Sequence, residues 1–269
     1  MFLVGDDRTE KPLLETRRLT GSLIHMGFTL AAVLCKGVHG SLLSVRDVVE
    51  DTCAQFLLRP YRVLVFTPDH LCEQDLTQQF QRPCVIDLKM GVHTWYPGAS
   101  EQYIAKCKEK DAESTSKDLG FRVSGLQAFD TNSGNSWKPG RIWCKTLDAN
   151  ATKLLLKQFV SSNPTDDMSP DCTYASAVYA GEDGIIKQLS ELRSWFAVQT
   201  SYHFFSSSIL LMYESNGLTQ DGPAQESMHG TVKLVDFAHV LMDQEAADEN
   251  FLQGLDSLIA ILCEIAGLN

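Results

Sequence analysis

Apolar and polar residues alternate in one short stretch near the middle of the chain. Within 84–90 the apolar side chains are interrupted by Asp87 and Lys89. A period of two is typical of a strand that buries one face and leaves the other to polar groups. We therefore predict a half-buried strand that carries Asp87 and Lys89 on the same face.

Other segments show strand-like or helix-like patterns at lengths usual for a globular domain. Ser100 is a suitable N-cap for a helix over 101–111. A stretch rich in Pro, Ser and Asp at 163–172 predicts a loop, as does the polar segment 130–136. The remaining predictions are strands at 121–129, 203–213 and 231–237, the last two adjacent, and helices at 149–161, 184–199 and 251–265.

Residues 1–70 have a different character from the rest of the chain. A charged start is followed by the apolar run 23–34 and the amphipathic run 42–58, which predict two helices. A β-rich segment at 61–66 predicts a strand. Neither standard type of glycine-rich phosphate loop occurs here.

Composition places the chain among ordinary globular proteins. It has 269 residues, of which 44% are hydrophobic and 21% charged, so a disordered or collagen-like chain is excluded. The formal net charge of −11 argues against a broad surface for nucleic acid or membrane. Basic residues slightly outnumber acidic ones within 83–145, so an anionic ligand is expected there.

The cysteines and the apolar segments bear on compartment. None of the eight cysteines forms a Cys-x-x-Cys pair, so a zinc cluster is not expected. Without a secretory signal, these scattered thiols are interpreted as reduced intracellular cysteines. The apolar stretch 23–35 is shorter than the roughly 20 residues of a membrane span, so no span is expected.

Asp87 and Lys89 together suit phosphoryl transfer. A carboxylate can orient or deprotonate a hydroxyl, while an ammonium group offsets charge on the transferred phosphate. The alternative is an ion pair on the surface of a strand.

Asp236 is a second candidate, because it ends an apolar strand that begins near Val232. A carboxylate in this position can hold magnesium beside a nucleotide. His239 follows three residues later and could face the same cleft. The alternatives are a capping aspartate and a structural histidine.

Lys106 and Lys110 share one face of the predicted helix, being four residues apart. Two ammonium groups on one stripe could bind a multiply phosphorylated ligand. Lys138 and Arg141 could extend the same basic wall. The alternative is a solvated helix in which Glu109 and Asp111 pair with the lysines.

Three motifs in order resemble the inositol polyphosphate kinase family. They are Pro83-x-x-x-Asp87-x-Lys89-x-Gly91, a Ser-Ser-containing strand at 206–214, and Val235-Asp-Phe-Ala-His239. The stretches 94–107 and 120–125 resemble the plant inositol polyphosphate multikinases in particular. The resemblance covers about residues 75–267.

The resemblance implies an α+β fold of two lobes related to protein kinases, with ATP between the lobes. It implies an atypical or incomplete N-terminal lobe over 1–74 and a C-terminal lobe over 75–269. The implied roles are catalysis by Asp87 and Lys89, cofactor binding by Asp75, Asp236 and Ser208 (or Ser207), magnesium binding by Asp236, and inositol phosphate binding by Lys106, Lys110, Lys138 and His239.

The implied activity is transfer of the ATP γ-phosphoryl group, with Mg²⁺, to the 3- and 6-hydroxyls of inositol 1,4,5-trisphosphate and tetrakisphosphates. The product would be the pentakisphosphate. The resemblance also implies location in the nucleus and cytoplasm, and we expect a monomer without nucleic-acid partners. A protein kinase is disfavoured, because the sequence has no His-Arg-Asp loop and no Ala-Pro-Glu segment.

The N-terminal region departs from the family pattern. The glycine-containing hairpin, the Lys-Pro element and the Arg-Gly…Glu stretch of the family are not recognisable in residues 1–70. Lys11-Pro12 is present, but its surroundings do not match. The alternative function is therefore a catalytically impaired protein, derived from a kinase, that binds inositol phosphates.

Overall fold

A computed structural model describes residues 64–66, 71–73, 77, 80–166, 168–215, 229–242 and 244–268. The chain divides into two compact units, which are treated separately. The larger comprises residues 80–232 and 239–269, and the smaller comprises residues 1–79 with Lys233–Ala238. The helices predicted at 23–34 and 42–58 lie outside the described residues.

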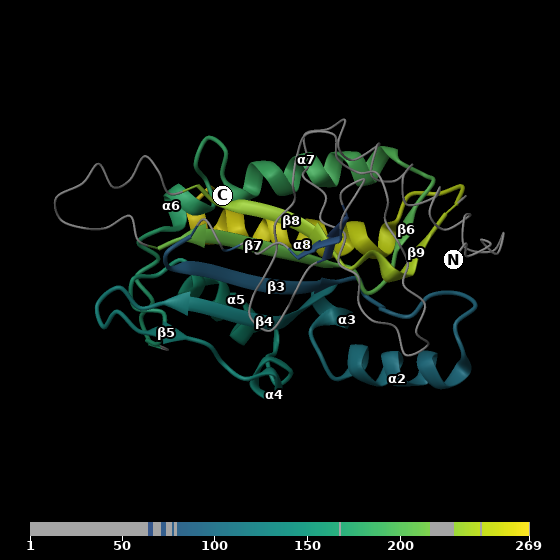
Figure 1. Cartoon of the computed structure of the whole chain (residues 1–269), viewed down its shortest axis with the longest axis horizontal. Coiled ribbons are helices and arrows are strands. Elements are labelled where there is room, and N and C mark those ends of the chain that lie inside the picture. The colour runs from purple at the N-terminus through teal and green to yellow at the C-terminus, as the bar shows by residue number, and fades with distance from the viewer. Residues whose placement is uncertain are drawn as a thin grey trace, which may run out of the picture. The chain divides into compact units, whose positions relative to one another are not determined.

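A five-stranded sheet with the order β5-β4-β3-β7-β8 organises the fold (Figure 1). The central strand β3 pairs antiparallel with β4 on one side and β7 on the other. The strands predicted at 84–90 and 121–129 are confirmed, as is the adjacency of the last two predicted strands. The bounds are β3 Pro83–Met90, β4 Phe121–Phe129, β5 Ser136–Trp137, β7 Ser208–Glu214 and β8 Thr231–Val235.

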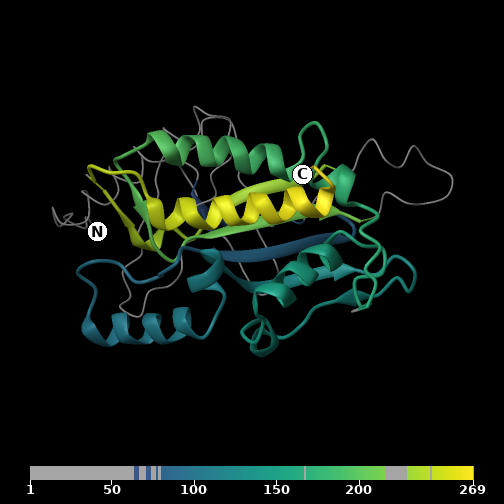
Figure 2. The ribbon, with the colours of Figure 1, turned by 180° about the vertical axis from the view of Figure 1, so that it is seen from behind.

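Three helices, α5, α7 and α8, cover one face of this sheet (Figure 2). The four helices predicted within the described residues, at 101–111, 149–161, 184–199 and 251–265, are confirmed. The side chains of Ser100, Asp148 and Asp248 cap the N-termini of α2, α5 and α8. The bounds are α2 Glu101–Ala112, α3 Ser116–Leu119, α4 Arg141–Cys144, α5 Ala149–Phe159, α6 Ala175–Val178, α7 Ile185–Val198 and α8 Glu249–Ala266.

The hydrophobic core lies between these helices and the sheet. Phe196 of α7 stacks on Phe251 of α8 with ring centroids 4.2 Å apart. Two fully buried tyrosines satisfy their hydroxyl groups on backbone carbonyls of α5: Tyr179 donates to Leu156 O at 2.8 Å, and Tyr213 to Phe159 O. The core therefore buries aromatic surface without leaving these hydroxyls unpaired.

A close approach between α8 and the turn before β4 requires glycine on both sides. Gly120 ends α3 with φ of +70°, and a Cβ on Gly254 would lie 2.3 Å from the carbonyl oxygen of Gly120. A side chain at Gly254 would push α8 away from this turn, so both positions depend on the absence of a Cβ.

One predicted strand is wrong in its extent. The segment predicted as a single strand at 203–213 contains two, β6 His203–Phe204 and β7, and β6 pairs with β9 Val240–Leu241 instead of joining the main sheet. The interruption falls at Ser206, whose φ is +54°. A residue in the left-handed region cannot continue a strand, and sequence alternation does not reveal it.

Two short strands belong to the smaller unit. β1 Leu64–Phe66 pairs antiparallel with β2 Leu71–Glu73. β1 coincides with the described part of the strand predicted at 61–66. None of the helices in the described ranges is long and apolar enough to cross a membrane.

Burial of Cys84 in β3 predicts a loss of stability at alkaline pH. Complete burial raises the pKa of its thiol from 9.0 to about 11. Between these values the unfolded chain loses the proton and the folded protein keeps it, so stability falls as pH rises, by roughly 2–3 kcal/mol at most.

The measurement is urea unfolding of wild type and of the Cys84→Ala variant at pH 8 and at pH 10.5. The wild type should lose more stability than the variant over this range. Cys263→Ala, at a half-buried site in α8, is the matched control. Equal pH dependence in wild type and Cys84→Ala would contradict the assignment.

Candidate functional site

The polar face of β3 carries the two residues predicted to be catalytic. Asp87 and Lys89 are half-buried, whereas the residues of the opposite face, Cys84, Ile86, Leu88 and Met90, are completely buried. Asp87 lies opposite Gly125 of β4, where an added Cβ would meet no atom within 4 Å. Open space therefore adjoins Asp87 on this face.

Lys89 is held against the turn that precedes β7. Its Nζ donates to the carbonyl oxygen of Ser206 at 2.6 Å, and the hydroxyl of Ser206 donates to Thr94 O at 2.9 Å. The Ser206 backbone adopts a positive φ, as does that of Asp236. Such conformations in residues other than glycine cost free energy and often occur at functional sites.

Helix α2 presents a narrow buried stripe and a basic exposed one. Cys107 and Asp111 are its buried residues. Lys106 and Lys110 are exposed, and neither takes part in an ion pair among the described residues. Lys106 and Lys110 are thus two exposed ammonium groups on α2, and their role in binding phosphate stays a prediction.

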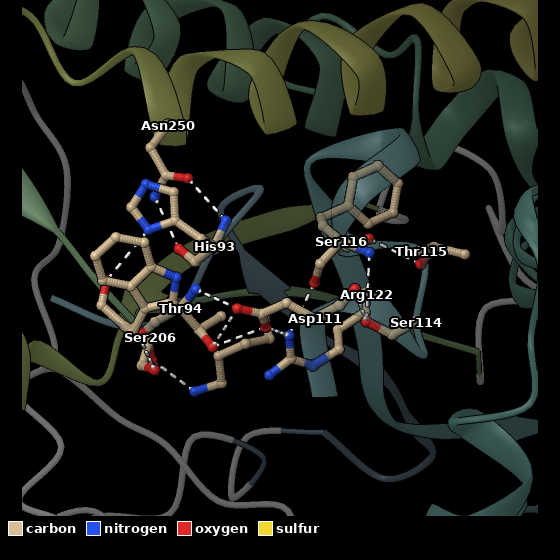
Figure 3. Close-up of polar contacts among 12 residues, drawn as sticks. His93, Thr94, Asp111, Ser114, Thr115, Ser116, Arg122, Ser206 and Asn250 are labelled. Atoms are coloured by element: carbon tan, nitrogen blue, oxygen red, sulfur yellow. Dashed lines mark hydrogen bonds and ion pairs between the residues drawn. The ribbon is translucent and has the colours of Figure 1, made fainter. Parts of the chain in front are cut away.

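Asp111 has a different role from the one considered for it. It does not neutralise the helix lysines, because its carboxylate is buried and accepts hydrogen bonds from the backbone N–H and hydroxyl of Thr94 at 2.7 and 2.8 Å. Arg122 of β4 forms an ion pair with it at 2.7 Å and also donates to Ser116 Oγ (Figure 3). A buried carboxylate requires such partners.

His239 lies in an aromatic group beside α2. Its ring stacks on Tyr96 with centroids 4.7 Å apart, and Tyr103 of α2 approaches it at 5.7 Å. Lys106 and Lys110 follow Tyr103 at helical spacing, so they continue the same side of α2. Burial raises the pKa of Tyr103 to about 12, so its hydroxyl is protonated at neutral pH.

The other predicted site residues are distributed as follows. Lys138 is exposed between β5 and α4, and Asp236 follows β8 in the segment Lys233–Ala238, which belongs to the smaller unit. Ser208 begins β7 directly opposite Lys89. Asp75 lies outside the described residues. The structure thus brings together Asp87, Lys89 and Ser208, and separately His239 with α2.

A nucleotide phosphate or its metal ion fits the polar face of β3. The hydroxyl of Ser208 is completely buried, and no described residue forms a hydrogen bond with its oxygen. A buried hydroxyl without a partner is unfavourable unless a ligand satisfies it. With the open space at Gly125, this supports the prediction that Ser208 contributes to a nucleotide site.

Several residues of the site were not singled out from the sequence. Thr94 and Arg122 lie in the two stretches that resemble the plant enzymes, but their pairing with Asp111 has no signature in sequence spacing. Tyr96 and Tyr103 could have been noticed as aromatic residues bracketing Ser100.

The fold and this polar face define a protein of the α+β kinase type, and comparisons with known proteins agree. The family model for inositol polyphosphate kinase matches residues 70–263. An inositol polyphosphate multikinase alpha from Arabidopsis thaliana is 45% identical over 194 residues, which are 71% of this chain and 67% of the relative. A rice (Oryza sativa subsp. japonica) multikinase is 44% identical over 73% of this chain and 66% of its own length.

Two solved structures resemble this chain. An inositol phosphate multikinase structure superposes with a TM-score of 0.66 at 43% identity and covers 75% of this chain and 88% of its own. An S. cerevisiae multikinase, solved with ADP and Mn²⁺, has a TM-score of 0.58 at 18% identity over 72% of this chain and 82% of its own, and shows the fold alone.

The chain belongs to the inositol polyphosphate kinase family. The predicted family and the α+β fold are thereby confirmed. The match spans about two thirds of the length of the plant relatives.

The positive φ of Ser206 predicts that substitutions there differ in stability according to their shape. A β-branched residue in this region is strained, so Ser206→Val should be less stable than Ser206→Ala by about 1–2 kcal/mol. The measurement is urea unfolding at neutral pH. The same two substitutions at Ser136, an exposed strand residue without a positive φ, are the control and should show no such penalty for valine. A Ser206→Val variant as stable as Ser206→Ala would refute the strain.

Proposed function

We propose that this protein is an ATP-dependent inositol polyphosphate multikinase. It phosphorylates the 3- and 6-hydroxyls of inositol 1,4,5-trisphosphate and of inositol tetrakisphosphates to give the pentakisphosphate. The observation that carries the proposal is the placement of Asp87 and Lys89 on the polar face of β3 in a chain of this family.

Geometry and charge support separate roles for Asp87 and Lys89 in the larger unit. Asp87 orients the attacking hydroxyl and accepts its proton, and Lys89, held by the Ser206 carbonyl, offsets negative charge on the group being transferred. Lys106 and Lys110 bind phosphates of the inositol as point charges. His239, stacked on Tyr96, and Lys138 complete the proposed contacts to the substrate.

ATP supplies the phosphoryl group, and Mg²⁺ would offset its negative charge. Asp236 is the proposed metal ligand, and a single carboxylate fits a cation that usually keeps several waters and takes substrate phosphates as further ligands. Ser208 satisfies its buried hydroxyl on the nucleotide phosphates. Asp75, which lies outside the described residues, is a further proposed contact to the nucleotide.

Replacement of Asp87 tests the proposal directly. In Asp87→Asn the carboxylate is lost with little change in volume, so kcat should fall by at least about a hundredfold, while the melting temperature stays close to that of wild type. The assay uses Mg-ATP and inositol 1,4,5-trisphosphate, with products separated by ion-exchange chromatography.

Asp118→Asn, an exposed carboxylate on α3, is the matched control and should retain wild-type turnover. An Asp87→Asn protein with most of its activity would refute the catalytic role. The thermal shift caused by inositol 1,4,5-trisphosphate is measured with and without Mg-ATP. A wild type that is stabilised in both cases but forms no product in the kinase assay would instead establish the alternative, a binding protein without catalysis.

The two lysines of α2 make a second test, because they act in substrate binding. In Lys106→Ala/Lys110→Ala the KM for inositol 1,4,5-trisphosphate should rise at least about tenfold, since each lost phosphate contact costs on the order of 1 kcal/mol. The KM for ATP should change little. Lys117→Ala, an exposed lysine on α3, is the control. An unchanged KM for the inositol phosphate in the double variant would contradict the role of this helix.

Location in the nucleus and cytoplasm and a monomeric state are further parts of the proposal. The family resemblance supports the location. Imaging of the tagged chain tests the first and light scattering of the purified protein tests the second. Exclusion from the nucleus, or a stable dimer, would contradict them.

A further inference from the structure

Helix α2 is attached to the larger unit by unusually little apolar surface. Of its two buried residues, Cys107 and Asp111, one is a carboxylate. By contrast α8 buries several large apolar residues, among them Phe251, Leu255 and Leu258. The position of α2 must therefore depend on polar contacts more than on hydrophobic packing.

The Asp111 carboxylate makes those contacts on two sides. From the segment after β3 it accepts the backbone N–H and the hydroxyl of Thr94. From β4 it accepts Arg122, whose same nitrogen, Nη1, also donates to Ser116 Oγ at 2.8 Å. These charge-assisted bonds are shorter and stronger than neutral ones, and they tie the last turn of α2 to two elements of the unit.

The contacts continue to the polar face of β3. Thr94 O accepts the hydroxyl of Ser206, and Ser206 O accepts Lys89 Nζ. Arg122 also lies opposite Lys89 in the register of β3 and β4. A set of hydrogen bonds through Asp111, Thr94 and Ser206 (Figure 3) therefore links α2 to Lys89 of β3.

We propose that Asp111 and Arg122 are positioning residues that hold α2 at a fixed place relative to β3. They set where the substrate phosphates bound by Lys106 and Lys110 lie with respect to Asp87 and Lys89. This inference rests on the proposed function. Neither residue touches the substrate; each acts through the helix.

The inference makes a selective kinetic prediction. Contacts from α2 hold phosphates that keep their charge in the ground state and in the transition state. Loss of these contacts raises the KM for the inositol phosphate, and misplacement of its hydroxyl relative to Asp87 and Lys89 lowers kcat as well. A role confined to general stability would instead lower the melting temperature without distinguishing the two substrates.

The experiment compares Asp111→Asn and Arg122→Lys with wild type in steady-state kinetics. Displacement of a binding helix by about 1 Å is enough to lower catalytic efficiency, kcat/KM, by about one to two orders of magnitude. The KM for inositol 1,4,5-trisphosphate should therefore rise about tenfold or more in Asp111→Asn and less in Arg122→Lys, which keeps the charge. The KM for ATP should stay within about twofold, because the proposed nucleotide contacts, Asp75, Asp236 and Ser208, lie outside α2.

The chain offers a matched control for the ion pair. Arg193 of α7 and Asp256 of α8 form another arginine–aspartate contact at 2.7 Å, between two helices remote from α2 in sequence. Asp256→Asn and Arg193→Lys should leave the KM for both substrates unchanged. The melting temperature of each variant is measured beside the kinetics, and Arg122→Lys carries the test if Asp111→Asn fails to fold.

A cycle of single and double variants checks that the two residues act as one unit. The combined Asp111→Asn/Arg122→Lys protein should have a KM close to that of Asp111→Asn, because the interaction is already lost in the single variant. If the KM of the double variant rose by the product of the two single-variant increases, the residues would act independently and the inference would be overturned.

The outcomes separate this inference from the function on which it rests. An active wild type whose KM for the inositol phosphate is unchanged in both variants would overturn the positioning role and leave the kinase proposal intact. Equal increases in the KM for ATP and for the inositol phosphate would also overturn it. A wild type that neither binds nor phosphorylates inositol 1,4,5-trisphosphate would overturn the proposed function itself.

Discussion

The alternation of buried and half-buried residues from Ile86 to Met90 of β3 is the constraint on which the rest of the structure depends. One face of this central strand is completely buried beneath α5, α7 and α8, so its register in the sheet cannot slip by a residue without exposing that face. This register places the side chains of Asp87 and Lys89 together on the opposite face. The packing of the core thus determines the placement of the two residues proposed for catalysis.

Two kinds of attachment coexist in the larger unit. The helices behind the sheet are held by apolar and aromatic surface, as in the stacking of Phe196 on Phe251. Helix α2 buries only Cys107 and Asp111, and the Asp111 carboxylate ties it to Thr94 and Arg122. Polar attachment is directional, and it suits a helix whose exposed lysines must meet phosphates at defined positions.

The sequence alone could predict the elements with strong periodicity and the motif residues they carry. Spacing and caps predict the helices α2, α5, α7 and α8 and the strands β3 and β4, and resemblance to the family identifies the motifs around Asp87 and Asp236. The break at Ser206 could not be predicted, because a positive φ in a serine does not change the alternation of apolar and polar residues. The pairing of Asp111 with Arg122 could not be predicted either, since contacts across a turn depend on tertiary packing that propensity does not encode.

Hydrogen–deuterium exchange of the full chain with and without inositol 1,4,5-trisphosphate tests most directly where the substrate binds. The account predicts slower exchange of the backbone amides of α2, residues 101–112, on addition of the ligand, since phosphates bound to Lys106 and Lys110 stabilise the helix. Exchange in α7, behind the sheet, should not change. Protection confined to other parts of the chain, with α2 unaffected, would contradict the account.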